Sequence, residues 1–599
     1  MFKKIIVCGL IKRERNKRIA YLIQTVTLLI MKYLITCSLF FYVLLVQTGC
    51  KKSTPNNPVE PTPVPLNLVS AKLDNAVGLL SSGTNVALNN NKSTTVVTRL
   101  SFNNAINRST VSGAVSFWSI AENTTVAVNY AYENNDSTLV ITPASPLQYF
   151  TQHSISVGVS LQSVKSKSLD AGIQILLNTK IDSTDKFPII SDNALLDTIQ
   201  KRTFKYFWDF GHPVSGLARE RSNGDNEVVT SGGSGFGIMS IPVAINRNFI
   251  TRSQGLAKMQ TIVSFLKNTA QTFHGAFPHW LNGTTGVVIP FSTKDNGADL
   301  VETAYLMAGL LTARQYFDNA GAAETALRND INILYNNVEW DWFRNGGQNV
   351  LYWHWSPNYN WDMNVQIKGW NECLVTYVLA ASSPTHAIPA TVYTAGWAGN
   401  GTTAGFINNN TFYNYTLPLG PNLGGPLFFS HYSFLGINPN GLSDVYANYE
   451  TQTKNHTLIN YAYCVNNPKN WFGYSDKNWG LTASDVTNGY EASSPSNDRS
   501  FIAPTAALSS FPYTPTESMR ALKFFYYTIG DKIFKQYGFV DAFSVNSVWF
   551  ANSFLAIDQG PIIIMLENYR SQLIWNLLTS CPEVKNGMKN VMGFSAPYL

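Results

Sequence analysis

The chain has 599 residues, 45% of them apolar and 13% charged, so it is long enough for more than one domain and does not have a disordered composition. Residues 1–30 carry seven of the 43 basic residues and one of the 37 acidic ones, which accounts for the formal charge of +6 and leaves the rest neutral. A neutral chain lacks the basic surface that attracts nucleic acid, and we exclude nucleic acid as a partner.

The uncharged part of the composition favours a sugar ligand. The chain has 14 Trp, 29 Tyr and 34 Phe, and it is also rich in Asn, Gly, Ser and Thr. Aromatic rings stack on the apolar faces of sugars, and amides and hydroxyls pair with sugar OH groups. We therefore predict an uncharged, polyhydroxylated ligand and no cofactor.

An export signal begins at Met31. The sequence MKYLITCSLFFYVLLVQTGCKKS has a short basic start and an apolar stretch of signal-peptide length, and Thr48 and Gly49 precede Cys50. This pattern resembles a bacterial lipoprotein signal, so we interpret residues 1–50 as a mis-called leader followed by a signal peptide. Cys50 would carry the lipid, which predicts an exported lipoprotein of the outer membrane.

Two features around this signal leave alternatives open. Gln47 stands where such signals usually carry Leu, so the second interpretation is an uncleaved membrane anchor, although the segment is short for a span. Lys51 and Lys52 stand where acidic residues often mark surface display, so the periplasmic side is as well supported as the cell surface. Residues 51–64 are a Pro-rich linker with little tendency to fold.

Residues 65–183 have the pattern of short strands. In SISVGVSLQ, Ile155, Val157, Val159 and Leu161 alternate with small or polar residues, and TVAVNY and STLVIT show the same alternation. Asn- and Ser-rich turns between such strands predict a β-sandwich. The stretch STLVITPASPLQYFTQHSISVGVSLQSVKSKSLDAG resembles bacterial Ig-like domains, which implies a spacer; carbohydrate binding is the alternative.

From residue 190 onward the apolar pattern becomes helical. In DNALLDTIQKRTFKYFWDF, Leu195, Ile199 and Phe204 recur near the 3.6-residue period. We therefore predict a mainly α domain over 190–599, whose helices and long loops fit an (α/α)6 toroid with the site at one end. Further amphipathic segments are predicted at 254–272, 298–317, 321–338, 363–380, 516–529 and 556–579.

Three acids stand close together in TKDNGADLVETAYLMAGLL, residues 293–311. On a helix, Asp295, Asp299 and Glu302 would occupy positions i, i+4 and i+7 of one face. Acids at a helix start complement its dipole and cap free N–H groups, which is one explanation. However, no Lys or Arg relieves their repulsion before Arg314, so the wall of a polar site is an equal alternative.

A further acid, Glu372, has apolar neighbours in MNVQIKGWNECLVTYVLA. It lies between Trp370 and the apolar Cys373 and Leu374. Burial disfavours the charged form and raises a carboxyl pKa, which a general acid requires near neutral pH. The alternative is a core Glu that pairs with Lys368.

Four more isolated acids have apolar or aromatic neighbours: Glu491, Asp541, Asp558 and Glu567. Several of them must be structural, and Glu567 is close enough to Arg570 to pair with it on one helix.

Other chemistries find little support. The Gly-rich TSGGSGFGIMS, residues 230–240, lacks the Lys of a phosphate loop, so we interpret it as close backbone packing at the site rim. The eight His show no HExxH or paired spacing, which argues against a catalytic metal. No GxSxG motif indicates a nucleophile elbow. Cys373, Cys464 and Cys581 are scattered and are expected to be buried as small apolar residues.

The helical part of the chain resembles one known family over residues 190–595. The motifs that carry the resemblance are FPHWLNG, KDNGADLVETAYLMAGLL, GWNE, NWGLTASD, IAPTAALSSFPYTP, YGFVDAFS and AIDQGPIIIMLENYRSQLIW, in the expected order. They look like the glucoamylase-like domain of glycoside hydrolase family 144, the bacterial β-1,2-glucanases. The resemblance implies an (α/α)6 toroid that cleaves β-1,2-glucan with inversion, to sophorooligosaccharides or to sophorose.

The resemblance also implies roles for particular acids. Glu372 is expected to be the proton donor, Asp299 the base, and Asp295 the residue that orients the base or binds a sugar hydroxyl. An inverting glycosidase places its two carboxyls about 6.5–9.5 Å apart. A proton relay through a substrate hydroxyl, as in related inverting enzymes, would also admit a more distant base. Expected sugar contacts are His279, Trp280, Phe236, Trp370, Tyr446 and Trp479.

Two other functions stay open beside the favoured one. The first is a glucoamylase-type hydrolase that acts on a different glucan. The second is a non-catalytic glucan-binding lipoprotein, against which the retained acids argue. We expect a monomer whose partners are a β-glucan substrate and, through the lipid, the outer membrane.

Overall fold

The structure is a computed structural model that describes residues 64–83 and 85–599. The predicted leader, signal peptide, lipidated Cys50 and nearly all of the linker lie outside these residues. Among the described residues, no helix is both long enough and apolar enough to cross a bilayer.

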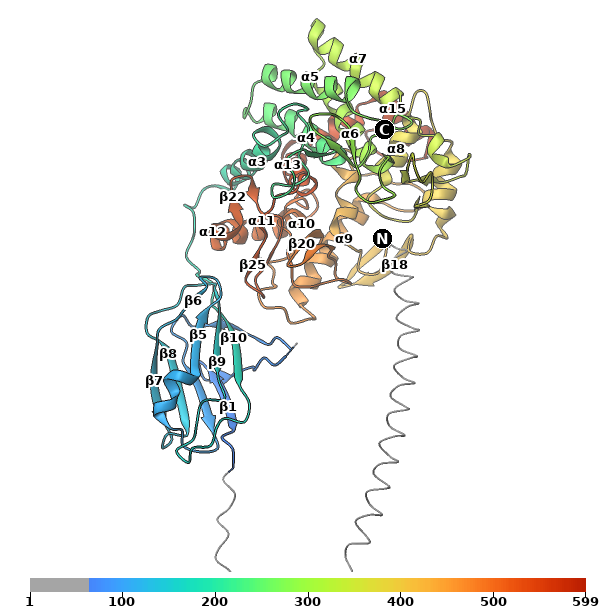
Figure 1. The fold of residues 1–599 in the computed structure, drawn as a ribbon. Helices are drawn as coiled ribbons and strands as arrows, with labels where there is room; N and C mark the ends of the chain where they lie inside the picture. Colours follow the sequence, from blue (N-terminus) through green and yellow to red (C-terminus); the bar gives the residue numbers. More distant parts are fainter. Residues whose placement is uncertain (1–63, 84) are drawn as a thin grey trace, which may run out of the picture. The chain divides into compact units, whose positions relative to one another are not determined.

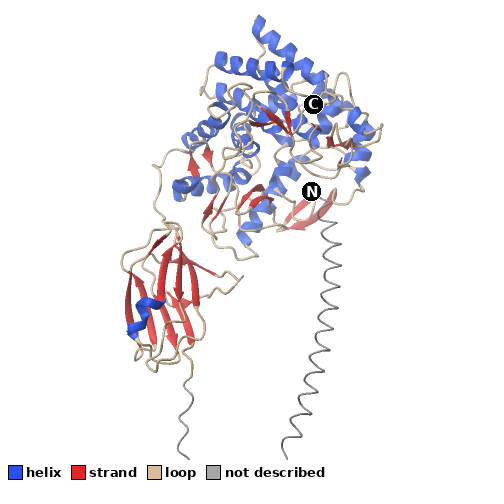
Figure 2. Ribbon diagram, in the orientation of Figure 1, coloured by secondary structure: helices blue, strands red, loops and turns tan. Residues whose placement is uncertain are grey.

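The first folded part is a β-sandwich of two five-stranded sheets (Figure 2). One sheet has the order β2-β1-β4-β8-β7 and the other β3-β10-β9-β5-β6, with β3 parallel to β10 and the other pairs antiparallel. The strands are β1 (Leu68–Leu73), β2 (Ala76–Val77), β3 (Leu88–Lys92), β4 (Thr98–Phe102), β5 (Val115–Ser119), β6 (Thr124–Thr125), β7 (Val128–Glu133), β8 (Thr138–Pro143), β9 (Gln152–Val157) and β10 (Ile173–Thr179).

Alternating apolar residues of both sheets form the sandwich core. Leu100 on β4, Ile141 on β8 and Ile155 on β9 are fully buried in one cluster. The predicted alternation through SISVGVSLQ stops early, because β9 ends at Val157 and Val159 is 54% exposed in the turn that follows.

From Asp192 the chain is mainly helical, with long loops between the helices (Figure 1). Ser191 caps the first helix by accepting from the Ala194 N–H, and Leu195 and Ile199 turn the apolar face inward. The helices are α3 (Asp192–Trp208), α4 (Ser231–Asn246), α5 (Arg252–Asn268), α6 (Leu300–Tyr316), α7 (Ala322–Asn336), α8 (Leu374–Ser382), α9 (Tyr449–Asn466), α10 (Pro504–Leu508), α11 (Pro515–Lys523), α12 (Gly530–Ile533), α13 (Ala556–Ser571), α14 (Leu573–Thr579) and α15 (Pro582–Asn586), with α2 (Val111–Ala114) in the sandwich.

Short strands fix the loops between these helices. They form one three-stranded sheet and six two-stranded ones. The strands are β11 (Val228–Thr230), β12 (Trp280–Asn282) and β13 (Val288–Ile289); β14 (Ala298–Asp299) with β16 (His354–Trp355); β15 (Leu351–Tyr352) with β17 (Gln366–Ile367); β18 (Ile407–Phe412) with β19 (Tyr415–Leu419); β20 (Ala483–Val486) with β21 (Gly489–Ala492); β22 (Phe534–Lys535) with β23 (Gly538–Phe539); and β24 (Phe543–Ser544) with β25 (Trp549–Phe550).

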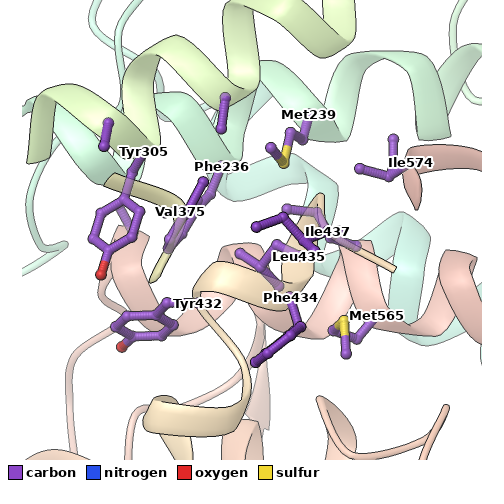
Figure 3. Packing of buried hydrophobic residues seen from close by; sticks show 14 of the residues in the cluster. Phe236, Met239, Tyr305, Val375, Tyr432, Phe434, Leu435, Ile437, Met565 and Ile574 are labelled. Carbon is purple, nitrogen blue, oxygen red and sulfur yellow. The ribbon is translucent and has the colours of Figure 1, made fainter. Parts of the chain in front are cut away.

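Helices α4, α6 and α13 form the middle of the helical domain, where α4 packs against both of the others. All three are buried on every side over most of their length, so they show little of the amphipathic period that marks a surface helix. Met239 of α4 and Met565 of α13 face the apolar segment that carries Phe434, Leu435 and Ile437 (Figure 3).

Several sequence predictions of this part need correction. The Gly-rich stretch 230–240 forms, from Ser231 on, the first turns of the buried helix α4, and the close backbone packing predicted for it is confirmed at Gly235. The predicted helix at 363–380 begins only at Leu374. Glu567 does not pair with Arg570: it binds Arg247 Nε at 2.7 Å, and Arg570 binds Asp197 at 2.6 Å.

Two glycines allow α4 and α6 to approach closely. A Cβ added to Gly309 would lie 2.2 Å from the Gly235 carbonyl oxygen, and one added to Gly235 would lie 2.2 Å from the Tyr305 carbonyl oxygen. Both distances are far inside van der Waals contact, and the atoms met are backbone atoms.

Gly309→Ala is therefore expected to destabilise the helical domain by about 1–3 kcal/mol through overpacking. Gly321→Ala is the matched control, since a Cβ there meets nothing within 4 Å. Urea unfolding followed by circular dichroism measures both variants. Equal stability of the two would contradict the close contact between α4 and α6.

Candidate active site

The N-termini of α4, α6 and α13 meet at one end of the helical domain. Gly232, the second residue of α4, donates its backbone N–H to Glu302 Oε2 on α6 at 2.8 Å. A Cβ on Gly233 would lie 2.6 Å from the Cβ of Ala556, the first residue of α13. Helix N-termini carry partial positive charge, so this end of the domain favours carboxylates.

Asp299 is the N-cap of α6 and is fully buried. Its Oδ1 accepts the backbone N–H groups of Val301 at 3.0 Å and Glu302 at 2.9 Å. Its Oδ2 accepts His279 Nδ1 at 3.0 Å and lies 3.6 Å from His354 Nε2. Burial by itself raises the pKa of Asp299. The hydrogen bond from His279 and the electrostatic effects of His354 and His279 outweigh burial, so the pKa of Asp299 is lowered. Asp299 is therefore ionised and has no free oxygen.

Asp295 lies outside the helix, in a turn closed by a bridge between Ser292 and Asp295. It is 4% exposed; its Oδ2 lies 3.6 Å from His354 Nε2, and its Oδ1 has no partner among the described residues. Burial, and then the charge of Asp299, raise the Asp295 pKa to about 7. The prediction that Asp295, Asp299 and Glu302 share one helical face is thus wrong, because α6 begins at Leu300 and the two aspartates precede it. The three acids nevertheless lie close together in space.

The two histidines of this group differ in charge. Burial lowers the His279 pKa, but Glu302 and then Asp299 outweigh it and raise the value to about 9. His354 has its pKa lowered to about 4, mainly by burial. At neutral pH, therefore, His279 is an imidazolium paired with Asp299, and His354 is neutral.

His279, Asp295 and Asp299 each offer one ligand atom within 4.8 Å of the others, which is the spacing of a metal site. The 3.0 Å bond between His279 and Asp299 already satisfies both groups without an ion. Within this group, Asp295 Oδ1 and His354 Nδ1 have no hydrogen-bond partner among the described residues.

Glu372 lies in the loop before α8 and is held through its backbone. Its carbonyl oxygen accepts hydrogen bonds from the Ser433 hydroxyl and, at 3.4 Å, from the Tyr305 hydroxyl. Burial, followed by Glu302 and Asp299, raises the pKa of its side chain to about 7. The side chain is half-buried, so it is reachable from solvent. Lys368 does not pair with it, because Lys368 Nζ donates to Gln366 Oε1.

Three of the residues expected to contact sugar lie in the core instead. Phe236, Trp370 and Trp479 are 1%, 4% and 0% exposed. Trp479 also donates its Nε1–H to the Glu517 carbonyl, which gives it a structural role. These three predictions are therefore corrected: the rings pack against protein and have no free face for a sugar.

The other three expected contacts are reachable. His279, Trp280 and Tyr446 are half-buried. His279 stacks on Phe291, with ring centroids 4.2 Å apart, and Trp280 meets the same ring edge-on. Phe291 is 49% exposed and was not singled out in the sequence. Phe291 ends the run VVIPF just before the acidic stretch, and the sequence gave no signal for it beyond its being aromatic.

Tyr305, His354 and Tyr432 also belong to the site, and the sequence did not mark them. Phe236, Tyr305 and Tyr432 form a cluster with centroid distances of 5.3 to 5.8 Å, and the hydroxyl groups of the two tyrosines point to the same side (Figure 3). His354 reaches Asp299 because β16 pairs with β14, a contact between residues 55 positions apart that no local pattern reveals.

Comparisons with known proteins find similar sequences and similar folds. The family model Glycoamylase matches residues 364–582, and the model of a bacterial Ig-like domain matches residues 75–178. An endo-β-1,2-glucanase from Chitinophaga pinensis, solved with sophorotriose and glucose, is 51% identical, with a TM-score of 0.67 over 69% of this chain and 100% of its own. A β-1,2-glucanase from Parabacteroides distasonis is 34% identical, with a TM-score of 0.66 over 88% of this chain and 74% of its own.

One further relative has a name that gives a more specific activity. An exo β-1,2-glucooligosaccharide sophorohydrolase (non-reducing end) from Parabacteroides distasonis is 41% identical over 445 residues. These cover 71% of this chain and 61% of the relative, so this chain spans less than two thirds of its length. The extent and identity of the matched structures nevertheless show the family: the chain belongs to the glucoamylase-like glycoside hydrolases of family 144 and carries a bacterial Ig-like domain ahead of the family domain.

Proposed function

We propose that this protein hydrolyses linear β-1,2-glucan with inversion and releases sophorooligosaccharides or sophorose. The observation that carries the proposal is Glu372, a reachable carboxyl whose pKa is raised to about 7 beside Asp299 and Glu302. A carboxyl that is protonated near neutral pH can protonate a glycosidic oxygen. The names of the similar glucanases support β-1,2-glucan as the substrate.

The geometry favours distinct roles for the three predicted acids. Glu372 donates its proton to the leaving oxygen. Asp299 was expected to be the base, but both of its oxygens are occupied and it is fully buried, so we assign it to holding His279 and the start of α6. Asp295 keeps one oxygen without a partner, and we assign that oxygen to a sugar hydroxyl.

The same proposal includes the wider architecture and the location of the protein. The (α/α)6 ring is supported by the packing of α4 against α6 and α13, of α13 also against α3 and α10, and of α6 also against α8. The sequence MKYLITCSLFFYVLLVQTGC supports export and a lipid on Cys50, on the periplasmic or outer side of the outer membrane. We propose that the protein acts there as a monomer.

The test is a substrate panel. Protein from Lys51 onward is offered linear β-1,2-glucan, sophorose, laminarin, cellulose and starch, and the products are sized by chromatography. We expect shortening of β-1,2-glucan alone. Cleavage of starch alone would favour the hydrolase of another glucan, and binding of β-1,2-glucan without shortening would favour a glucan-binding lipoprotein.

The pH dependence provides a second check of the donor. Glu372 must be protonated to act, and its pKa is raised from an ordinary 4.5 to about 7. The donor is therefore active below pH 7 and is lost as the pH rises through that value. We expect kcat/KM to fall about tenfold per pH unit on the alkaline side. A profile flat to pH 9 would contradict the assignment.

A further inference from the structure

A second group of acids lies outside the set described above. It consists of Asp485 on β20, Asp541 before β24 and Asp558 in the first turn of α13, which are 9%, 1% and 1% exposed. The backbone N–H of Asp485 donates to Asp541 Oδ2 at 2.6 Å, which ties two of them together.

Among the described residues, the ion pair that this group forms is between Arg221 and Asp485. Arg221 binds Glu220 at 2.8 Å and Asp485 at 3.2 Å, and the Ser553 hydroxyl also donates to Asp485. No Lys, Arg or His of the described chain forms an ion pair with Asp541 or Asp558. The carboxyls of Asp541 and Asp558 share a hydrogen bond with each other, and Asp541 Oδ1 and both oxygens of Asp558 have no other hydrogen-bond partner there. Buried carboxyl oxygens with no further partner indicate that the pair binds a water or a ligand.

Two buried carboxylates without a cation cannot both stay ionised. Burial and the charge of Asp485 raise the pKa of Asp541 to about 7, and burial and the charge of Asp541 raise that of Asp558 well above its ordinary range. The pair therefore holds one proton near neutral pH and can accept a second, as coupled carboxyls do.

Tyr432 links this pair to the proton donor. Burial raises its phenol pKa most, and Asp558, Tyr490, Glu372 and Asp541 add to that effect, so Tyr432 lies near both the pair and Glu372. Asp558 is fixed there because Gly560, two residues later on α13, packs on Phe236 of the aromatic cluster; a Cβ on Gly560 would lie 2.4 Å from Phe236 Cβ.

A groove lies beside this group of acids and is lined in part by Asp485. This groove, of about 630 Å³, lies between the β20–β21 and β24–β25 hairpins, and Arg221, Asp485, Tyr490, Trp549 and Asn552 are among the residues that line it. It presents aromatic rings beside polar groups, the combination that suits sugar rings.

We propose that the Asp541–Asp558 carboxyl pair activates the hydrolytic water, an inference that rests on the proposed glucan hydrolysis. One carboxylate of the pair takes a proton from water while the water oxygen bonds to C1 of the sugar. The bond from C1 to the glycosidic oxygen breaks, and that oxygen takes the Glu372 proton. One water is consumed and C1 is inverted. Before the next turnover the pair releases its extra proton to solvent and Glu372 takes one up from solvent.

Chemical rescue by azide tests this assignment in the full chain. Azide attacks C1 without losing a proton, so it replaces both water and base. We expect Asp558→Ala and Asp541→Ala each to lower kcat on β-1,2-glucan by about 10²–10⁴-fold. Sodium azide should restore turnover in at least one of them and give an α-glucosyl azide, identified by NMR.

Asp295→Ala and Asp299→Ala are the matched controls, which azide should not restore. Rescue of either control, or the absence of rescue in both pair variants, would overturn the assignment, and so would wild-type kcat in Asp558→Asn. Binding of sophoropentaose, measured by calorimetry, shows that each variant is folded. If Asp541→Ala or Asp558→Ala is unfolded, the Asn variant at the same position replaces it, and only its kcat is compared with the wild type. A wild type that cleaves no β-1,2-glucan would remove the proposed function itself, whereas an active wild type without rescue would remove only the role of the pair.

Discussion

Glu372→Gln is expected to lower kcat on β-1,2-glucan by about 10²–10⁴-fold, because the amide has nearly the shape of the acid but no proton to give. The reason lies in the raised pKa of Glu372, which makes it the reachable proton donor of the site near neutral pH. Initial rates from a reducing-end assay, with kcat and KM fitted separately, measure the change. KM should change little, because Gln keeps the hydrogen-bonding capacity of the side chain.

Glu517→Gln is the control for this variant. Glu517 lies on α11, 22% exposed, beside Arg520, and a surface pair of this kind contributes about 0–1 kcal/mol. We expect wild-type turnover from it. If Glu372→Gln kept the wild-type rate, Glu372 could not be the proton donor.

Glu567→Ala is expected to destabilise the helical domain by about 3–5 kcal/mol. Glu567 is fully buried on α13 and accepts from Arg247 at 2.7 and 3.0 Å, from Asn246 at 2.9 Å, from Gln200 at 3.1 Å and from the Ser571 hydroxyl. Removing the carboxylate leaves the charge of Arg247, whose side chain is 20% exposed, without its partner. Urea unfolding, followed by circular dichroism at 222 nm, measures the loss.

The pH dependence of the same contact has a definite sign. Burial raises the pKa of Glu567, but the bonds from Arg247 and its other donors outweigh it, so the folded pKa is below the ordinary 4.5. The contribution is therefore present above pH 4.5 and is lost as the pH falls through the lowered value. Glu491→Ala, which breaks a surface pair with Arg499, should cost less than about 1 kcal/mol. Equal losses in the two variants would contradict a buried network.

Residues whose function is local could be predicted from the sequence. Glu372 stands among apolar neighbours in the chain, and the structure keeps it there with a raised pKa. The β-sandwich and α3 also follow from local alternation and local period.

Contacts that depend on burial from every side could not be predicted. Helix α4 carries four glycines and is buried by α6 and α13, so its sequence lacks the amphipathic period that marks the surface helices. Trp479 is a residue type that often stacks on sugars, yet tertiary packing buries it in the core. Asp541 and Asp558 looked like isolated acids in the sequence, because only the fold brings them near Tyr432 and Glu372.

A crystal structure of Glu372→Gln bound to a linear β-1,2-glucooligosaccharide tests the central claim most directly. We predict one bound saccharide chain with a glycosidic oxygen within hydrogen-bonding distance of residue 372, either directly or through one sugar hydroxyl. A well-ordered saccharide that binds elsewhere on the domain and leaves residue 372 in contact only with protein would contradict the account.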